Sequence, residues 1–254
     1  MCLKTAVMAL LMELLETGAR EWGVQLTPEQ VEAFELYYNG LVAWNEKANL
    51  TAITGYEDVQ VKHFLDSLSC LQVLSPLPPQ TRCVDIGAGA GFPGLPLKIV
   101  CPQMRLTVLE ATGKKVLFLE HIVAELGLHE VQIIKGRAED LGRQPAHRES
   151  YQVALARAVA QLPVLLEYAL PLLTMGGRFV AQKGMEIEDE VEAAQAALEV
   201  LGGQIKEMKA VHLPGLEALR HLVVVEKVAP TPQKYPRRAG IPAKRPLARP
   251  LLPD

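Results

Sequence analysis

The chain has 254 residues, a formal net charge of −3, 49% hydrophobic residues and only 5% aromatic residues. This length suits one α/β domain with a small accessory element, and the aliphatic composition favours helices on a parallel sheet over an all-β or disordered chain. The near-neutral charge argues against a globally basic nucleic-acid-binding protein, so an RNA contact would have to come from a local patch.

The cysteines indicate a reducing compartment. They show neither C-x-x-C spacing nor the density of a disulfide-stapled secreted domain, and they are Cys2, Cys70, Cys83 and Cys101. We interpret them as reduced thiols of a cytoplasmic protein and expect no metal site. The N-terminus resembles a signal peptide only faintly, because acidic residues follow at once, and we predict an amphipathic helix there. The chain has no run of about eighteen apolar residues, so we expect no membrane span.

The first 75 residues are predicted to form an N-terminal helical subdomain. Helical patterns cover residues 3–22, 28–43 and 57–70. The second begins with an N-cap, a proline at the first helical position and a capping-box glutamine, which are Thr27, Pro28 and Gln30. Three prolines within four positions cannot continue a helix and predict a linker, at Pro76, Pro78 and Pro79.

A glycine-rich loop follows the strand-like run 81–86. Glycines at alternate positions, Gly87, Gly89 and Gly91, let the backbone turn tightly and approach a ligand. A dinucleotide fingerprint would need glycine at position 92, where the chain has Phe92, so pyrophosphate is not favoured. An acid two residues before the first glycine, Asp85, resembles the loop of Rossmann-like methyltransferases that bind S-adenosylmethionine (SAM), in which the carboxylate lies near the methionine ammonium group.

Two further acids follow the next strands. Glu110 closes the run 105–110, about twenty residues after the loop, where a βαβ unit would place an acceptor for ribose hydroxyls. Glu139 follows the strand 131–135, where related enzymes hold the adenine edge. The alternative is that these acids are surface or capping residues and that the loop is a plain strand-to-helix turn.

From residue 81 onwards strand-like and helix-like segments alternate, which predicts a doubly wound sheet. The expected strands are 81–86, 105–110, 131–135, 152–157, 178–183, 204–211 and 221–227, and the expected helices are 94–101, 114–126, 163–173 and 186–201. The last two strands have no obvious helix between them and are expected to form an antiparallel pair at the sheet edge. The predicted fold class is therefore α/β, a Rossmann-like class I SAM-dependent methyltransferase sheet over 76–228.

Residues 229–254 form a basic, proline-rich tail whose only acid is Asp254. Such a segment cannot fold alone and presents concentrated positive charge, so phosphate is its natural partner. Tyr235 adds a surface for stacking an RNA base, whereas the alternative is a solubilising disordered end. Deletion after Lys227 is expected to weaken RNA binding and spare the cofactor site. The candidate RNA-binding residues are Lys234, Arg237, Arg238, Lys244 and Arg245, with Lys183 after an earlier strand.

Several segments together resemble one family nearly end to end, the bacterial small-subunit rRNA guanine-N7 methyltransferases known as RsmG or GidB. They are Trp44-Asn45, Asn49 to Ile53, His63 to Leu68, the glycine loop with Phe92 to Ile99, Arg137-Ala138-Glu139, Ala156 to Ala160, Lys183-Gly184 and Lys234 to Arg238. The resemblance implies methylation of guanine 527 of 16S rRNA, with SAM as cofactor and S-adenosylhomocysteine as product. It also implies SAM contacts from Gly87, Phe92, Ala138, Glu139 and Arg157, with Glu110 on the ribose. One departure, Gly113 before Lys114 and Lys115, removes no proposed ligand.

The chemistry of the acceptor can be narrowed further. Guanine N7 has an in-plane lone pair and no proton, so methyl transfer needs alignment and no obligatory base. The Asp/Asn-Pro-Pro-aromatic motif of exocyclic amine methyltransferases is missing from residues 155–160, and no cysteine has the setting of a cytosine-C5 nucleophile. Both absences favour a ring nitrogen.

The candidate catalytic groups outside the loop are His63, Asp66 and Arg157. His63 and Asp66, three apart on one helix face, either point together at the cofactor cleft or hydrogen-bond each other. Arg157 and Lys183 follow strand ends and either hold cofactor, base or phosphate or are ordinary ion-pair partners. The alternative functions are methylation of another RNA, a protein or a small molecule, and non-catalytic ribosome binding. We expect a monomer that binds 16S rRNA or the small ribosomal subunit.

Overall fold

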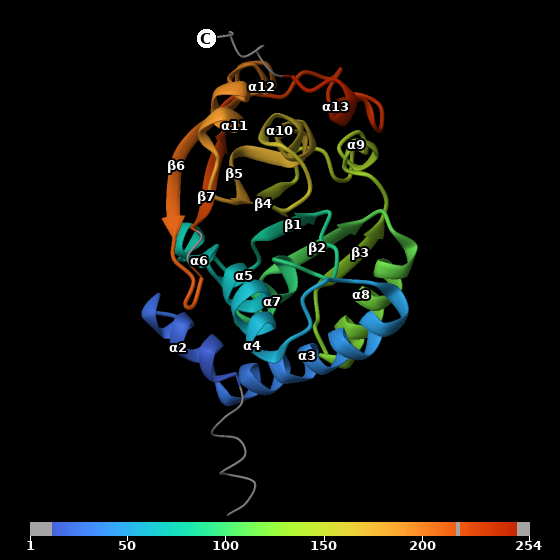
Figure 1. Cartoon of the computed structure of the whole chain (residues 1–254). Helices are drawn as coiled ribbons and strands as arrows, with labels where there is room; N and C mark the ends of the chain where they lie inside the picture. Colours follow the sequence, from blue (N-terminus) through green and yellow to red (C-terminus); the bar gives the residue numbers. More distant parts are fainter. Residues whose placement is uncertain (1–11, 217–218, 248–254) are drawn as a thin grey trace, which may run out of the picture.

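The computed structural model describes residues 12–216 and 219–247. A single sheet of seven strands, in the order β3-β2-β1-β4-β5-β7-β6, runs through the middle of the molecule, with helices on both faces (Figure 1). Neighbours among β1 to β5 are parallel, and β7 is antiparallel to both β5 and β6. The predicted α/β class and the antiparallel pair at the edge are confirmed. The strands are β1 Arg82–Ile86, β2 Arg105–Glu110, β3 Val131–Lys135, β4 Tyr151–Arg157, β5 Leu173–Lys183, β6 Gly203–Val211 and β7 Arg220–Lys227.

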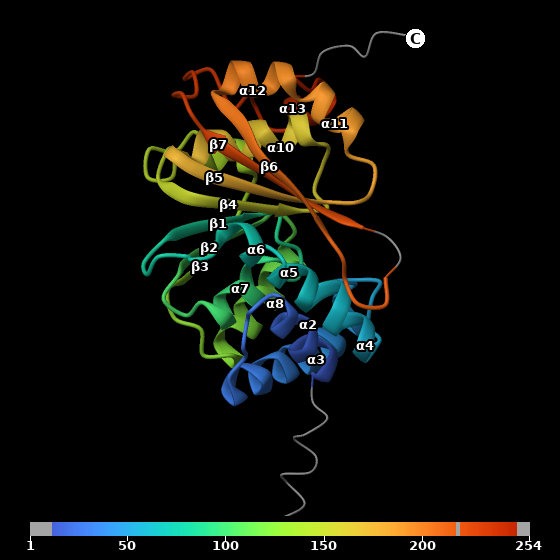
Figure 2. The same ribbon diagram turned by 90° about the vertical axis from the view of Figure 1, so that its left-hand side faces the viewer.

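Successive residues of the central strands face opposite layers, as the pleat requires. In β4, Val153 and Leu155 belong to one hydrophobic core, and Ala154 and Ala156 belong to the other. The first core is covered by the N-terminal helices with α7 (Gly94–Val100) and α8 (Gly113–Glu125), and the second by α10 (Leu162–Ala169), α11 (Glu188–Ala193) and α12 (Gln195–Leu201) (Figure 2).

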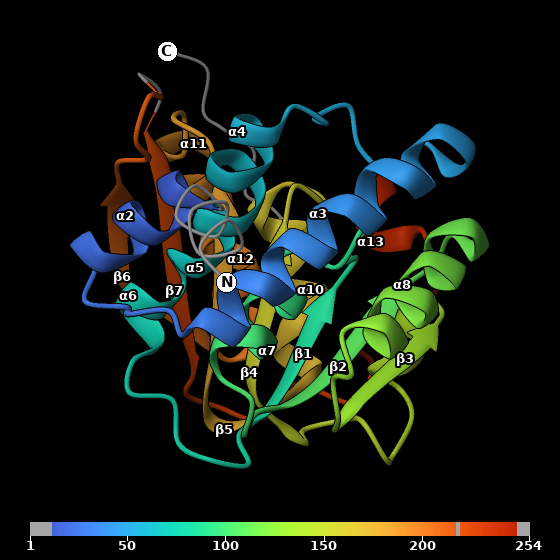
Figure 3. The same cartoon turned by 90° about the horizontal axis from the view of Figure 1, so that it is seen from below.

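The N-terminal helices have no separate core. They are α2 (Glu13–Glu21), α3 (Pro28–Ala48), α4 (Tyr56–Val59), the π-helix η1 (Gln60–Leu65), α5 (Asp66–Leu68) and α6 (Leu71–Leu74). Figure 3 shows α3 running across the layer that contains α7 and α8. The ring of Tyr37 on α3 stacks on Phe92 with a centroid distance of 5.4 Å, and Phe34 packs on Phe64. The helical region therefore shares one core with the sheet.

Element boundaries differ from the sequence expectation in several places. The capping box at Thr27 is present, but α3 continues to Ala48, where Asn49 adopts a left-handed conformation (φ 49°) and ends it. The helix expected over 186–201 breaks at Ala194, so that α12 can pack on α10 and β6. Strand β5 begins at Leu173, where a register shift against β4 and Gly176 (φ 73°) produce an irregularity that a period-two pattern does not reveal.

The described part of the tail packs on the domain and includes the short helix α13 (Ile241–Lys244). The Arg148 guanidinium donates to the carbonyl oxygens of Thr231 and Tyr235, each at 2.7 Å. The Tyr235 side chain is 8% exposed and belongs to the second core. The expectation that this ring offers a stacking surface is therefore wrong, because burial against the domain outweighs its basic surroundings. Over residues 229–247 the solubilising disordered end is excluded as well.

None of the helices within 12–216 and 219–247 is long and apolar enough to cross a membrane.

Candidate functional site

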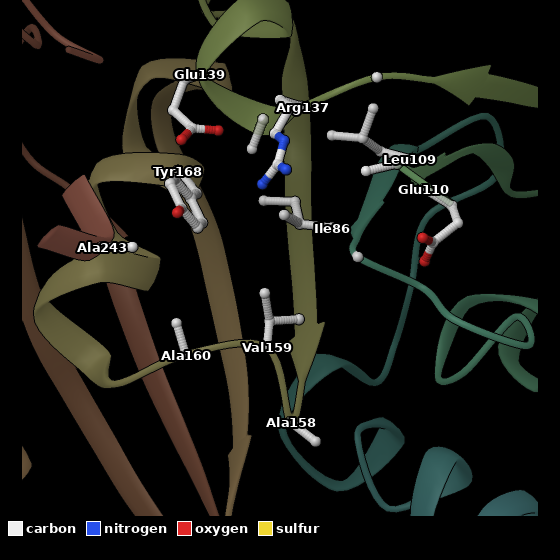
Figure 4. Close-up of a pocket in the computed structure, with 14 residues that line it drawn as sticks. Ile86, Leu109, Glu110, Arg137, Glu139, Ala158, Val159, Ala160, Tyr168 and Ala243 are labelled. Atoms are coloured by element: carbon white, nitrogen blue, oxygen red, sulfur yellow. The ribbon is translucent and has the colours of Figure 1, made fainter. Parts of the chain in front are cut away.

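The carboxyl ends of β1 to β4 meet around a pocket of about 360 Å³ (Figure 4). Glu110 lies on one side of it, and Glu139, Tyr168 and Ala243 lie on the other. This edge of an open α/β sheet is where ligands bind, because the loops that follow neighbouring strands converge there. The remaining lining residues are Ile86, Gly87, Leu109, Ala111, Gly136, Arg137, Ala138, Ala158, Val159 and Ala160.

The glycine loop after β1 adopts the conformation that its sequence predicts. Gly87, Gly89 and Gly91 have φ values of 68°, 62° and 97°, a region that costs other residues free energy. At Gly87 an added Cβ would lie 2.8 Å from Val159 Cγ2, so the backbone there is closely approached from the pocket side. The loop is therefore shaped for close contact with a ligand.

Glu110 is bound to the glycine loop. Its Oε2 accepts the Gly89 N–H at 2.9 Å, and its Oε1 accepts the Thr112 N–H at 2.7 Å. The side chain is 6% exposed and lines the pocket. Each carboxylate oxygen has a second lone pair, so both can accept a hydrogen bond from a ligand hydroxyl.

Asp85 and Phe92 lie behind the loop and are not among the residues that line the pocket. Asp85 is fully buried, and its Oδ2 accepts the Gly94 N–H at 2.7 Å. Burial is the main cause that raises the pKa of Asp85 to about 7, against the opposing effect of the Gly94 hydrogen bond. Its Oδ1 is buried without a hydrogen-bond partner among the described residues. The Phe92 ring stacks on His63, with a centroid distance of 4.6 Å.

A second pocket, of about 470 Å³, adjoins the first, and Ala158 lines both. Ala158 has a φ of 54°, an uncommon value for a residue with a Cβ, and such residues concentrate at functional sites. This second pocket, termed the acceptor pocket below, is lined by charged side chains of both signs. Its lining consists of Lys62, His63, Asp66, Arg157, Ala158, Gln182, Lys183, Gly184, Glu190 and Arg220.

Arg157 is held from several directions at the base of the acceptor pocket. Its Nη1 donates to Asp66 Oδ2 at 2.8 Å and to the Lys62 carbonyl oxygen at 3.2 Å. Its guanidinium carbon lies 4.9 Å from the centroid of the Phe92 ring, and Nη2 lies 3.3 Å from His63 Nδ1. Arg157 therefore has one fixed orientation.

His63 and Asp66 both reach this pocket, which confirms that they share one face. The π-helix η1 ends at Leu65, immediately before Asp66, and the sequence had suggested only regular helix over 57–70. The two side chains bind Arg157 and have no hydrogen bond to each other in the structure. Gln182 of β5 supports Asp66 by donating from Nε2 to its carbonyl oxygen at 2.6 Å.

Burial, with a further contribution from the Arg157 charge, lowers the pKa of His63 to about 4. The unfolded chain therefore binds more protons than the folded chain between about pH 6.5 and 4, and His63 makes the free energy of unfolding rise with pH in that window. Comparison of wild type with His63→Gln, by urea unfolding between pH 4 and 7, should reveal this dependence, with an amplitude of about 2–3 kcal/mol.

The raised pKa of Asp85 acts in the opposite direction, so the wild-type profile alone is expected to be shallow. The difference between wild type and His63→Gln isolates the histidine. The exposed His129→Gln exchange is the control. A difference that is flat across the window would contradict a buried, neutral His63.

Two candidate RNA contacts are already engaged in ion pairs. Lys183 Nζ lies 2.5 Å from Glu190 Oε2 and donates to the Ala160 carbonyl oxygen at 2.8 Å, so the ion-pair interpretation of Lys183 describes this structure. Arg237 pairs with the fully buried Glu167 at 2.6 Å. The four other basic residues named for the tail, Lys234, Arg238, Lys244 and Arg245, are exposed.

Three site residues escaped the sequence analysis. Tyr168 lies on α10, whose apolar sequence predicts only packing, and it lines the first pocket. Glu190 lies on α11, whose acidic sequence predicts a solvent-exposed face, yet it accepts the Leu162 N–H at 2.8 Å. Tyr37 donates from its hydroxyl to the Ala90 carbonyl oxygen within the glycine loop. The hydrogen bonds of Tyr37 to Ala90 and of Leu162 to Glu190 join residues 53 and 28 apart, so no local pattern predicts them.

The sheet topology, with two adjoining pockets at the carboxyl edge, is that of a Rossmann-like α/β fold. Similar folds include a mutant of MtNAS in complex with S-adenosylmethionine (TM-score 0.52, 17% identity, 80% of this chain and 78% of that one). TrmN from Thermus thermophilus is another (TM-score 0.50, 18% identity, 66% of this chain and 53% of that one).

The chain belongs to the GidB family, rRNA small subunit methyltransferase G, whose model matches residues 30–223. Among its relatives, the ribosomal RNA small subunit methyltransferase G of Roseiflexus castenholzii is 52% identical over 229 residues, 90% of this chain and 97% of the relative. That of Pelotomaculum thermopropionicum is 48% identical, over 94% of this chain and 100% of the relative.

Proposed function

We propose that this protein transfers the methyl group of SAM to N7 of guanine 527 in 16S rRNA of the small ribosomal subunit. The observation that carries the proposal is the pair of pockets that share Ala158 at the carboxyl edge of the sheet, in a chain of this family. One pocket has carboxylates suited to a zwitterionic nucleoside, and the adjoining pocket has fixed cationic groups suited to an RNA nucleotide.

The residues that line the first pocket, together with the glycine loop beside it, fit SAM. Gly87 and Gly89 let the backbone approach the cofactor, and Glu110 has lone pairs for the two ribose hydroxyls. Ala138 and Glu139 are assigned to the adenine edge. Asp85, with an unpartnered buried oxygen behind the loop and a pKa raised to about 7, would be held as the carboxylate by the methionine ammonium group.

When bound, SAM supplies an electrophilic methyl group: the N7 lone pair forms the new C–N bond, the S–C electron pair stays on sulfur, and no proton leaves. Catalysis is therefore mainly alignment. In this assignment Arg157 donates to guanine O6, next to N7, and Asp66 and Phe92 fix the guanidinium. His63, neutral at pH 7, lies beside the Arg157 guanidinium without adding a competing charge.

The exposed cations Lys234, Arg238, Lys244 and Arg245 are proposed to bind RNA phosphates, with affinity that falls as salt rises. Arg237 and Lys183 are instead assigned a structural role, through their ion pairs with Glu167 and Glu190. We further propose that the protein acts as a monomer in the cytoplasm. The free thiols of Cys70, Cys83 and Cys101 support a reducing compartment.

Small ribosomal subunits that lack the modification, incubated with tritiated SAM, test the proposal. We expect label in 7-methylguanosine at position 527 after nucleoside analysis, and much less with an Arg157→Ala enzyme. Label on another base or on protein would refute the assignment. SAM binding without any transfer, to subunits or to free rRNA, would instead favour a ribosome-binding protein.

A further inference from the structure

The last described segment of the chain closes one side of the cofactor pocket. Ala243 lines the pocket, on the same side as Glu139 (Figure 4), and the Gly240 N–H donates to Glu139 Oε1 at 2.8 Å. We infer that residues 231–244, here termed the C-terminal strap, position Glu139 for the adenine of SAM, so that the ion pair of Arg237 with the buried Glu167 controls cofactor affinity. The inference rests on the proposed adenine contact of Glu139.

The strap is anchored by a buried carboxylate. Glu167 on α10 is fully buried, and Arg237 donates to it from Nη2 at 2.6 Å, from Nε at 2.9 Å and from its backbone N–H at 2.8 Å. Arg148 binds two strap carbonyls as a second anchor. A buried ion pair with several hydrogen bonds is costly to break from one side, because the remaining charge stays buried. The strap therefore has a defined position on the domain.

The strap reaches Glu139 through a short connection. Only two residues separate Arg237 from Gly240, whose φ of 80° turns its N–H toward the carboxylate. Glu139 is 2% exposed, so its orientation depends on such partners. Gly240 binds Oε1 and the Tyr168 hydroxyl is a further partner of the carboxylate, which leaves lone pairs for a donor such as the adenine amino group. Loss of the anchor at Arg237 would remove the Gly240 contact and leave Tyr168 to orient Glu139.

The same strap carries exposed cations, among them Lys234, Arg238 and Lys244. An RNA that bound these side chains would favour the strap in its packed position. The cofactor, which contacts Glu139, would favour the same position. Their binding free energies are then coupled, and the coupling is reciprocal. This differs from the expectation that the tail can be deleted without harm to the cofactor site.

Calorimetric titration of the full chain with S-adenosylhomocysteine tests the inference. Arg237→Ala should weaken binding about tenfold, whereas Gln233→Ala, at an exposed position of the strap, should leave it unchanged. Gly240→Ala keeps the ion pair and the N–H but penalises the left-handed conformation, and should weaken binding about fivefold without unfolding the protein.

S-inosylhomocysteine has an oxygen in place of the 6-amino group of the adenine. The ratio of its dissociation constant to that of S-adenosylhomocysteine measures recognition of the amino group, and a general loss of stability would not change this ratio. Wild type should prefer the adenosyl compound, and both strap variants should lose most of that preference. If wild type binds neither compound, the proposed function fails. If wild type binds and discriminates but Arg237→Ala and Gly240→Ala do so equally well, the role of the strap is overturned.

Discussion

Replacing Gly87 with arginine is expected to abolish SAM binding in calorimetry while the chain still folds. Position 87 has a φ of 68°, and a Cβ there would lie 2.8 Å from Val159 Cγ2, so an arginine side chain would fill the space between the glycine loop and the pocket. The left-handed backbone adds about 1–2 kcal/mol of strain. The large effect is steric, because the side chain occupies volume that the cofactor requires.

Gly127→Arg is the matched control for this substitution. Gly127 also has a positive φ, 59°, but a Cβ there meets nothing within 4 Å. Both variants carry the left-handed strain and should still fold, Gly87→Arg with the larger loss of thermal stability because of the Val159 contact, and only Gly87→Arg should lose SAM. Retention of wild-type affinity by Gly87→Arg would place the cofactor elsewhere.

Arg157→Ala should lower kcat/KM for methylation of the ribosomal subunit by about 10²–10³-fold, because the group that orients the base is lost. It should also destabilise the fold by about 3 kcal/mol, since the Asp66 side chain is 6% exposed and would keep only the more distant Arg220, whose Nε lies 4.0 Å from Oδ1. Single-turnover methylation and urea unfolding measure the two effects separately.

Two further variants separate orientation from stability. Arg157→Ala combined with Asp66→Asn removes the buried charge and should recover much of the stability, yet none of the activity. Arg157→Lys keeps the charge but loses the planar guanidinium, whose Nη1 donates to both Asp66 and the Lys62 carbonyl oxygen and whose Nη2 lies beside His63, so it should remain impaired. Activity in the double variant that matches wild type would show that Arg157 does not orient the substrate.

The sequence predicted the cofactor side of the site better than the acceptor side. Gly87, Glu110 and Glu139 follow successive strands, and strand ends meet wherever the sheet is parallel, so local pattern and topology suffice to bring them together. Arg157 was found by the same rule. Asp85 fits the loop motif, but only the structure shows that it caps the turn at Gly94 and lies behind the pocket.

Other features depend on contacts between distant segments, which no local pattern encodes. The pairing of Arg237 with Glu167 joins residues 70 apart and turns a residue of a basic tail into an internal anchor. Tyr235 is buried for the same reason. The π-helix before Asp66 and the break at Ala194 escaped prediction because apolar spacing there is compatible with an unbroken helix.

The contact between α3 and the glycine loop has a consequence for how the enzyme can respond to its substrate. Tyr37 bonds the Ala90 carbonyl oxygen and stacks on Phe92, which in turn lies against Arg157 and His63. Helix α3, the glycine loop and the acceptor pocket are thus joined by a continuous series of side-chain contacts. If the ribosomal substrate displaced α3 on binding, the displacement would reach the glycine loop and Arg157 through these contacts, and no separate hinge would be required.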